Sequence, residues 1–379
     1  MIYLDNSATT CTLDEAADTA KLYMCARFFN TSSAYQPAVE ADRDVQAARA
    51  RLAECLQADK DEIIYTSGGT ESNNMAVYGV LNARRGGRLV AGITEHPSVY
   101  EVANSLRQKG AEVDFVPVTD SGSVDMAYLE SVLKNDTALV SLMHINNETG
   151  AVNDLGAIYK LIKSRAPRAV FHADGVQAFC KMPFKNPECD LYSISGHKFH
   201  GPKGIGALYI RKGTRFTGSL AGGGQERNLR SGTTNTPGIM GMDAALSFYR
   251  DYQQDAIAKM RACKLRLAKN LMEVDEAVIN GPMPDEGAPH ILNVSFMGVK
   301  GEVLLHALEE FKIYVSTGSA CSAHKKGKNR VLESMGIKGP RQEGAIRFSL
   351  CPFNTLAEMD ETALVIKEQV KYLRKFKRR

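Results

Sequence analysis

The chain has 379 residues, of which 44% are hydrophobic and 24% are charged, and its formal net charge is +4. This composition is ordinary for a globular protein and excludes a chain dominated by disorder. The charge is too small to indicate nucleic-acid binding by itself. No apolar run approaches the roughly 18 residues that a membrane span requires. We therefore expect no membrane partner and no direct contact with nucleic acid.

The N-terminal sequence MIYLDNSATT has neither the basic lead nor the apolar core of a signal peptide. The eight cysteines contain no CxxC pair and no cluster with zinc-ligand spacing. We therefore expect a cytoplasmic protein with free thiols and no metal site.

Short β-rich runs alternate with helical patterns over the first two-thirds of the chain. Strands are predicted at residues 63–66, 89–93, 138–143, 169–172 and 191–194. Helices are predicted between them at residues 71–84, 98–109 and 154–165. This alternation predicts an α/β domain with a mostly parallel sheet that helices cover on both faces. Ligands bind beyond the carboxyl ends of such strands, so the residues that follow them are the candidates for a site.

The pattern changes after about residue 250. A charged amphipathic stretch, 251–274, precedes a strand at 290–296, a helix at 302–311 and strands at 313–316 and 345–349. A capping box at Thr355 and Glu358 predicts the start of the last helix. This part is predicted to form a smaller α+β domain.

The segment SISGHKFHGPKGIG, residues 193–206, concentrates chemistry directly after a predicted strand. Lys198 alone would most simply be a solvated charge. Its glycine neighbours let the backbone approach a ligand, and Ser195 and His197 are natural hydrogen-bond donors to phosphate. The glycines at 201–206 lead into a strand rather than a helix, which excludes a dinucleotide-binding fingerprint.

Two further segments follow predicted strands. TSGGTESNN, residues 66–74, joins a strand to a helix, so Gly69 and Thr70 are either ordinary cap residues or an anion cradle. HADGVQ, residues 172–177, places Asp174 at a strand end, where a carboxylate is either structural or the partner of a protonated ring nitrogen. A lysine, an acid and an anion cradle together indicate pyridoxal phosphate.

The ordered motifs TSGGTESNN, TEHPSV, MHINNETG, HADGVQ, SISGHK, GGGQERNLRSGT, STGSACS and IRFSL span nearly the whole chain. In these motifs the sequence resembles the class V aminotransferase family, and within it the cysteine desulfurases of the NifS/IscS type. The resemblance implies the PLP-dependent transferase fold of type I, with a mostly parallel seven-stranded sheet. It implies a large domain over residues 15–250. A small domain, residues 1–14 and 251–379, would carry the catalytic cysteine loop.

The resemblance also assigns roles to single residues. Lys198 matches the lysine that holds the cofactor covalently, and His96 matches the histidine that stacks on the ring and aids proton transfer. The other cofactor and substrate contacts implied are Asp174 for the ring nitrogen, Asn147 and Gln177 for the ring hydroxyl or the substrate, Gly69, Thr70, Ser195 and His197 for the phosphate, and Arg347 for the substrate carboxylate. Thr233 matches a residue that reaches the phosphate of a neighbouring subunit, which implies a homodimer.

Cys321 lies in STGSACS, a run of small residues followed by His324, Lys325 and Lys326. An isolated cysteine is most often an inert packing residue. Here the basic neighbours favour the thiolate, and the resemblance makes Cys321 the residue that takes up sulfur.

The implied reaction converts L-cysteine to L-alanine and passes the sulfur as a persulfide to an acceptor protein, for iron–sulfur cluster assembly or tRNA thiolation. The enzymatic alternative is a selenocysteine lyase or another pyridoxal-phosphate-dependent β-lyase. A plain aminotransferase has no use for the STGSACS segment. A non-catalytic scaffold would not need Lys198, Asp174 and Cys321.

Overall fold

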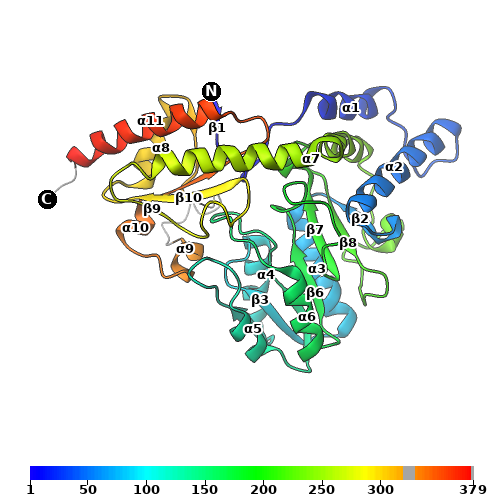
Figure 1. Cartoon of the computed structure of the whole chain (residues 1–379). Coiled ribbons are helices and arrows are strands. Elements are labelled where there is room, and N and C mark those ends of the chain that lie inside the picture. The colour runs from blue at the N-terminus through cyan, green and yellow to red at the C-terminus, as the bar shows by residue number, and fades with distance from the viewer. Residues whose placement is uncertain (319–328, 377–379) are drawn as a thin grey trace.

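The computed structural model describes residues 1–318 and 329–376 (Figure 1). Cys321 and its basic neighbours lie outside the described residues. No helix in the described part of the chain is long and apolar enough to cross a membrane.

A seven-stranded sheet forms the centre of the larger part of the molecule. Its strands are β2 (Ile63–Thr66), β3 (Arg88–Gly92), β4 (Val113–Val116), β5 (Thr137–Ser141), β6 (Val170–Asp174), β7 (Leu191–Ser195) and β8 (Gly206–Ile210). The strand order is β2-β8-β7-β6-β5-β3-β4, and β8 alone of these seven runs antiparallel to its neighbours. The predicted sheet is confirmed; the prediction did not place β4.

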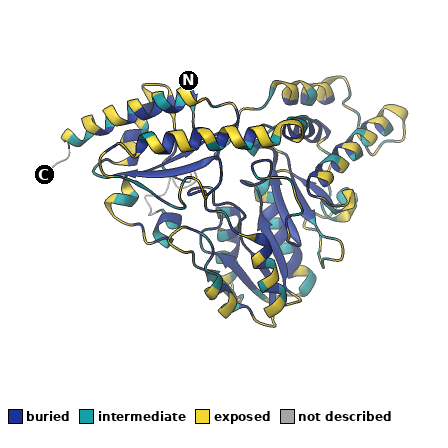
Figure 2. Ribbon diagram, viewed as in Figure 1, coloured by how far each residue is buried: buried dark blue, intermediate teal, exposed yellow. Residues whose placement is uncertain are grey.

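Successive residues of each strand enter different hydrophobic cores, because side chains alternate between the faces of a sheet. On β2, Ile63 and Tyr65 belong to one core and Ile64 belongs to the other. The core of Ile64 is shared with helices α3 (Gly69–Arg84) and α4 (Pro97–Gln108). The opposite core includes residues from α2 (Gln36–Cys55), α5 (Met126–Val132), α6 (Leu155–Arg165) and α7 (Thr236–Leu271). Most strand residues are accordingly buried, as Figure 2 shows, whereas residues 113–115 of the edge strand β4 are half-buried.

A smaller sheet lies beside the first and has its own core. Its order is β12-β10-β9, and it is antiparallel throughout. The elements of this part are β9 (Ala277–Ile279), β10 (Ile291–Phe296), α8 (Gly301–Glu309), β11 (Ile313–Tyr314), α9 (Arg330–Ser334), α10 (Pro340–Glu343), β12 (Ala345–Ser349) and α11 (Leu356–Leu373). The N-terminal strand β1 (Ile2–Tyr3) pairs with β11, so the first residues join the C-terminal part. The capping box at Thr355 is present.

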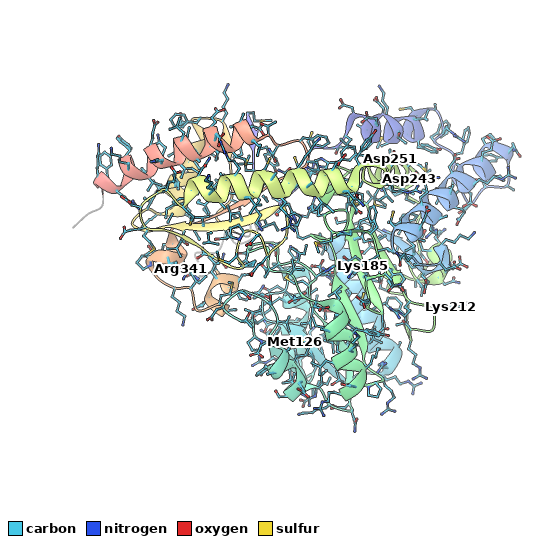
Figure 3. The ribbon with its side chains drawn as sticks, viewed as in Figure 1. Met126, Lys185, Lys212, Asp243, Asp251 and Arg341 are labelled. Carbon is cyan, nitrogen blue, oxygen red and sulfur yellow. The ribbon has the colours of Figure 1, made fainter. Side chains whose placement is uncertain are left out.

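Helix α7 crosses the predicted domain boundary and lies along the top of the molecule in Figure 1, below α1 (Asp14–Cys25) and α11. The charged amphipathic stretch 251–274 therefore falls mostly on the second half of a longer helix. Its backbone is non-helical at Tyr252, next to Asp251, which Figure 3 labels. Residues before this point pack into the core of the large sheet, and Cys263 and Leu267 pack into the smaller core. The division at residue 250 stays a prediction.

Candidate active site

A cavity of about 310 Å³ opens where the carboxyl ends of β2, β6 and β7 meet the N-terminal segment and β12. It is lined by ten of the predicted site residues: Gly69, Thr70, His96, Asn147, Asp174, Gln177, Ser195, His197, Lys198 and Arg347. The topology thus brings together residues that lie as far apart in the sequence as Gly69 and Arg347.

The N-terminus of α3 provides the anion cradle. Gly68, the N-cap, has φ of 144°, which glycine adopts without strain. A Cβ on Gly69 would stand only 2.7 Å from a methyl group of Val176, so any larger residue there would require Val176 to move. Helix N-termini leave backbone N–H groups unpaired and carry positive dipole charge. This corner of the cavity therefore suits a phosphate group.

Two polar side chains stand beside that cradle. Ser195 is buried at the end of β7, and His197 hydrogen-bonds Thr9 through Nδ1 at 3.1 Å. Burial lowers the pKa of His197 to about 3, and the charges of Lys198, Lys181 and Lys203 contribute to the shift. Neutral His197 is then a hydrogen-bonding group near the cradle rather than a cation.

Asp174 ends β6 with its carboxylate in the cavity. One oxygen accepts a hydrogen bond from the Val176 N–H at 3.0 Å, and the other accepts one from Asn73 Nδ2 at 2.7 Å. The side chain of Asn73 also donates to Ser98 at 2.8 Å, while its Oδ1 has no partner among the described residues. The carboxylate is thus held in one orientation, with lone pairs remaining for a further N–H donor.

Lys198 follows β7 in a short 3-10 turn, and its Nζ points to the N-terminal segment. It donates to the carbonyl oxygens of Ser7 at 2.6 Å and Ala8 at 2.7 Å. These are backbone acceptors that fix the amine without neutralising its charge.

His96 is the N-cap of α4, and its Nδ1 lies 2.7 Å from Ser98 Oγ. Burial lowers the pKa of His96; Asp174 opposes the shift, and Lys198 and Arg330 add to it. Arg330 supports the loop before His96: it donates to the carbonyl of Glu95 at 2.7 Å and to that of Ile93. A neutral imidazole in a fixed position can stack on a ring or exchange a proton.

Gln177 lines the cavity next to the N-terminal segment. Its Nε2 donates to the Ser7 carbonyl at 2.9 Å, and its Oε1 lies 3.4 Å from both Lys181 Nζ and His290 Nε2. Burial lowers the pKa of Lys181 to about 7. The buried amine therefore loses its proton more easily than an exposed lysine does.

Arg347 reaches the cavity from β12 and is 2% exposed. Its Nη2 bonds Asp5 Oδ1 at 2.6 Å, and its Nη1 donates to the Asn147 carbonyl at 3.1 Å. Its Nε has no partner in the described part of the protein. Asp5 is not among the residues that line the cavity, so it holds the guanidinium from outside.

Two predicted residues are not in this cavity. Thr233 is exposed and does not line it, and Cys321 lies outside the described residues. The chain on both sides of the segment 319–328 is tied to the site. Ser316 exchanges two backbone hydrogen bonds with Arg347, and Asn329 donates to Glu148 at 2.5 Å.

Sequence reasoning missed Asp5, Asn73 and Arg330. Asp5 lies in the N-terminal sequence MIYLDNSATT and Asn73 lies in the motif TSGGTESNN, so both stand in segments that the sequence analysis had already singled out. Arg330 has no comparable signal, because its acceptors are backbone carbonyls more than 230 residues away.

The residues present fit pyridoxal phosphate. The cradle at Gly69 is narrow, since a Cβ there would press on Val176, and the carboxylate of Asp174 is fixed with a lone pair free. The amine of Lys198 enters the same cavity. This is the donor set that the cofactor's phosphate, ring nitrogen and aldehyde require.

Comparisons with known proteins agree with this arrangement. The family model for aminotransferase class-V matches residues 2–362. A cysteine desulfurase of Trichormus azollae is 38% identical over 378 residues, covering 99% of this chain and 94% of the relative. A solved structure titled NifS-like protein superposes with a TM-score of 0.91 at 35% identity, covering 98% of this chain and 99% of the other. Another, titled SspA in complex with cysteine, superposes with a TM-score of 0.82 at 29% identity, covering 94% and 100%. The chain belongs to the aminotransferase class-V family.

Proposed function

We propose that this protein is a pyridoxal-phosphate-dependent cysteine desulfurase that converts L-cysteine to L-alanine. The observation that carries the proposal is that Lys198, Asp174 and the cradle at Gly69 meet in the cavity that Arg347 also lines. Full-length relatives named cysteine desulfurase support the choice of reaction. The relative solved with cysteine supports the choice of substrate.

The cofactor, when bound, supplies an aldehyde for an amino group and a ring that accepts the electron pair of a broken bond at Cα. Lys198 would hold the cofactor covalently, and its amine would be the base for the proton on the substrate Cα. Asp174 stabilises a proton on the ring nitrogen, and Asn73 and Val176 keep its carboxylate aimed. Gly69, Thr70, Ser195 and His197 hold the phosphate.

The remaining wall of the cavity positions the substrate. Arg347 binds the substrate carboxylate, a planar group that matches the guanidinium fork. Asp5 orients Arg347 through the 2.6 Å ion pair. His96 would stack on the ring and exchange a proton, while Asn147 and Gln177 would contact the ring hydroxyl or the substrate.

Cys321 accepts the sulfur. Its thiolate attacks the sulfur of the substrate, and a new S–S bond forms. The Cβ–S bond breaks, its electron pair stays on Cβ, and Cβ takes up a proton, which gives alanine. The basic residues that follow Cys321 in the sequence favour the thiolate. The resulting persulfide then passes to an acceptor protein.

The partners follow from the same proposal. We expect a homodimer in which the exposed Thr233 reaches the phosphate of the neighbouring subunit. The sulfur acceptor is an iron–sulfur scaffold or a tRNA-thiolation enzyme, and the reaction takes place in the cytoplasm.

The test incubates the yellow holoenzyme with L-cysteine and measures alanine, pyruvate and the mass of the protein. The expected result is alanine, together with a protein mass increased by one sulfur atom. Cys321→Ala abolishes that increase, while Cys25→Ala, at an exposed position on α1, retains it. Pyruvate in place of alanine identifies a β-lyase instead, and sulfide release at the wild-type rate by Cys321→Ala refutes the role of Cys321.

A further inference from the structure

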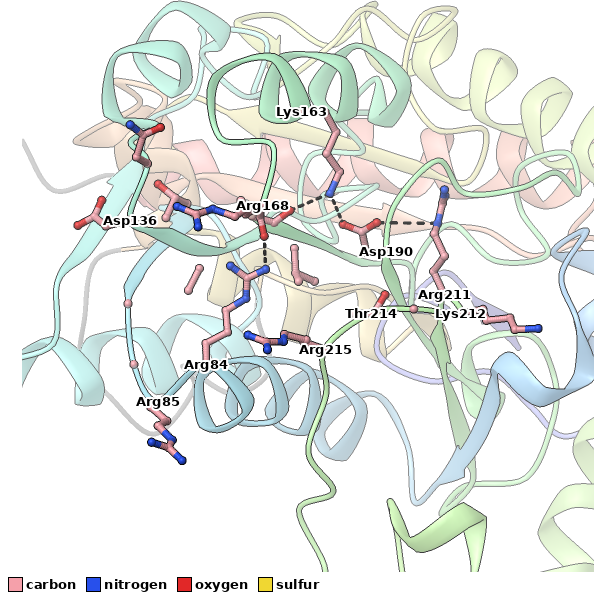
Figure 4. A pocket seen from close by; sticks show the side chains of 18 residues that line it. Arg84, Arg85, Asp136, Lys163, Arg168, Asp190, Arg211, Lys212, Thr214 and Arg215 are labelled. Carbon is pink, nitrogen blue, oxygen red and sulfur yellow. Dashed lines mark hydrogen bonds and ion pairs between the residues drawn. The ribbon is translucent and has the colours of Figure 1, made fainter.

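A second cavity lies at the amino ends of the parallel strands of the central sheet, on the side away from the cofactor cavity. Its volume is about 780 Å³, and we call it the basic cleft (Figure 4). Its walls are the C-terminal end of α3, the turn before β5, the turn between α6 and β6, and the segment after β8. Helix α3 thus begins at the cofactor cavity and ends at the basic cleft, about 24 Å away for 16 residues at 1.5 Å each.

The basic cleft carries a large excess of positive charge. Seven arginine and lysine side chains line it: Arg84, Arg85, Lys163, Arg168, Arg211, Lys212 and Arg215. The two carboxylates that line it are Asp136 and Asp190. Asp190 lies 2.8 Å from Lys163 and 3.9 Å from Arg211, and Asp136 lies 3.4 Å from Arg88. Five of the seven cations therefore have no ion pair with a carboxylate of the described chain.

Three of these five cations crowd together. Arg84 donates to the Arg168 carbonyl oxygen through Nη2, as Figure 4 shows, and its buried Nε has no partner among the described residues. Burial lowers the pKa of Arg84, and the positive charges of Arg215 and Arg168 lower it further. The cleft thus contains mutual repulsion between guanidinium groups that a bound anion would relieve.

Complementation of helix dipoles accounts for only part of this charge. Arg84 and Lys163 lie in the last turns of α3 and α6, where cations interact favourably with the helix dipole. Lys212 and Arg215 follow strand β8 and gain no such stabilisation. Their convergence with Arg84 and Arg168 therefore needs another reason.

The lining favours phosphate over other anions and a small ligand over a polymer. One guanidinium group can donate two parallel hydrogen bonds to the oxygens of a phosphate group. The described lining contains no aromatic ring on which a nucleic-acid base would stack. Its volume lies in the range of small-molecule sites, about 300–1,000 Å³. At Gly86 and Gly213 no atom lies within 4 Å of the place where a side chain would begin, so the cleft is open beside these two residues.

We propose that the basic cleft binds a small ligand carrying two or more phosphate groups, held by Arg84, Arg168 and Arg215. This site is separate from the cofactor's phosphate cradle, because the two lie at opposite ends of α3. The proposal does not depend on the proposed reaction.

The test is calorimetric titration of the holoenzyme, saturated with pyridoxal phosphate and freed of excess, with inorganic tripolyphosphate at low salt. Saturation removes the cofactor's phosphate cradle from competition. The expected result is one binding event that weakens as potassium chloride is added.

The double variant Arg168→Glu/Arg215→Glu should bind tripolyphosphate about tenfold more weakly or worse, because two charge-assisted contacts are lost. Both side chains are exposed, so the fold should survive, and retained cofactor colour checks it. Arg107→Glu/Lys109→Glu makes the same charge change at exposed positions at the end of α4 and should keep wild-type affinity. The proposal would be overturned if tripolyphosphate did not bind, or if both double variants weakened its binding equally. It would also be overturned if the protein bound duplex RNA but did not bind tripolyphosphate.

Discussion

The two ends of the parallel strands in the central sheet use polar side chains in opposite ways. We call the side where the strands end, at the cofactor cavity, the carboxyl edge, and the side where they begin, at the basic cleft, the amino edge. At the carboxyl edge, Asp174 and Arg347 are nearly buried, and each makes two hydrogen bonds to neighbouring groups. At the amino edge, Arg168, Lys212 and Arg215 are exposed, and their side chains make no ion pair with a carboxylate of the described chain. Asp174 and Arg347 are therefore held in place before a ligand binds, whereas the three basic side chains at the amino edge extend into solvent.

Helix α3 explains part of this difference. Its N-terminus faces the cofactor cavity, where the helix dipole is positive and itself favours an anion. Its C-terminus faces the basic cleft, where the dipole is negative and anion binding has to come from side chains. The carboxyl edge therefore suits chemistry that needs precise placement. The amino edge suits binding governed by charge.

Replacing the lysine of the carboxyl edge should have the largest effect. Lys198→Ala should lose the yellow colour of covalently bound cofactor and lower alanine formation by a factor of about 10²–10⁴ or more, because the positioned base is lost. Lys212→Ala, at the amino edge, is the control and should retain both. Absorbance and alanine production measure the two effects. Wild-type activity in Lys198→Ala would remove Lys198 from the mechanism.

Asp174→Asn keeps the shape of the side chain and removes its charge. The ring nitrogen then has no anionic partner, so kcat should fall about 100-fold or more. Asp136→Asn makes the same change at the amino edge and should keep wild-type kcat. Steady-state kinetics with L-cysteine measure both variants, and equal rates for the two would contradict the role of Asp174.

Changes at Arg347 should act mainly on substrate affinity. Arg347→Lys loses the two-pronged contact with the carboxylate, so KM for L-cysteine should rise about tenfold or more. Asp5→Asn leaves Arg347 present but less firmly oriented, so a smaller increase in KM with nearly unchanged kcat is expected. A fall in KM for Asp5→Asn would mean that Asp5 competes with the substrate instead of positioning Arg347.

The parts of the site that the sequence predicted are those that follow strands directly. Gly69, Asp174 and Lys198 each come at or just after a strand end, and the carboxyl ends of parallel strands meet at one edge. The pairing of Asp5 with Arg347 spans 342 residues and depends on how β1 and β12 are brought together. Spacing along the chain contains no information on such a contact.

The basic cleft was missed for the same reason. Arg84, Arg168 and Arg215 come from three separate segments, and none lies in a run of basic residues long enough to stand out. The charged amphipathic stretch 251–274 corresponds to the part of α7 that passes from the core of the large sheet to the smaller core, and its pattern alone did not show that the helix already begins at Thr236.

Buried histidines should make the stability of the protein depend on pH. Burial lowers the pKa of His172, on β6, to about 4, with Asp174 opposing the shift, and lowers those of His144 and His200 to about 4 as well. The unfolded chain therefore binds more protons than the folded chain between about pH 6.5 and 4, so stability should fall as pH falls through this window.

Removing one of these histidines should weaken that dependence. His172→Gln should reduce the loss of unfolding free energy between about pH 6.5 and 4 by about 3 kcal/mol at most, measured by urea unfolding at several pH values. His306→Gln, at an exposed position on α8, is the control and should keep the wild-type slope. An unchanged slope in His172→Gln would mean that this side chain titrates alike in both states.

The smallest expected effect concerns the repulsion in the basic cleft. Arg215→Gln removes one charge that acts on Arg84, so the free energy of unfolding should rise by a few tenths of a kcal/mol at low salt. High salt should abolish the gain because it screens the repulsion. Arg107→Gln is the control and should show no gain, and both variants should keep wild-type kcat and KM for L-cysteine because neither residue lines the cofactor cavity. Thermal unfolding at two salt concentrations measures the difference. A loss of stability in Arg215→Gln at low salt would show that Arg215 is compensated within the protein, and the contrast between the two edges would then fail at this residue.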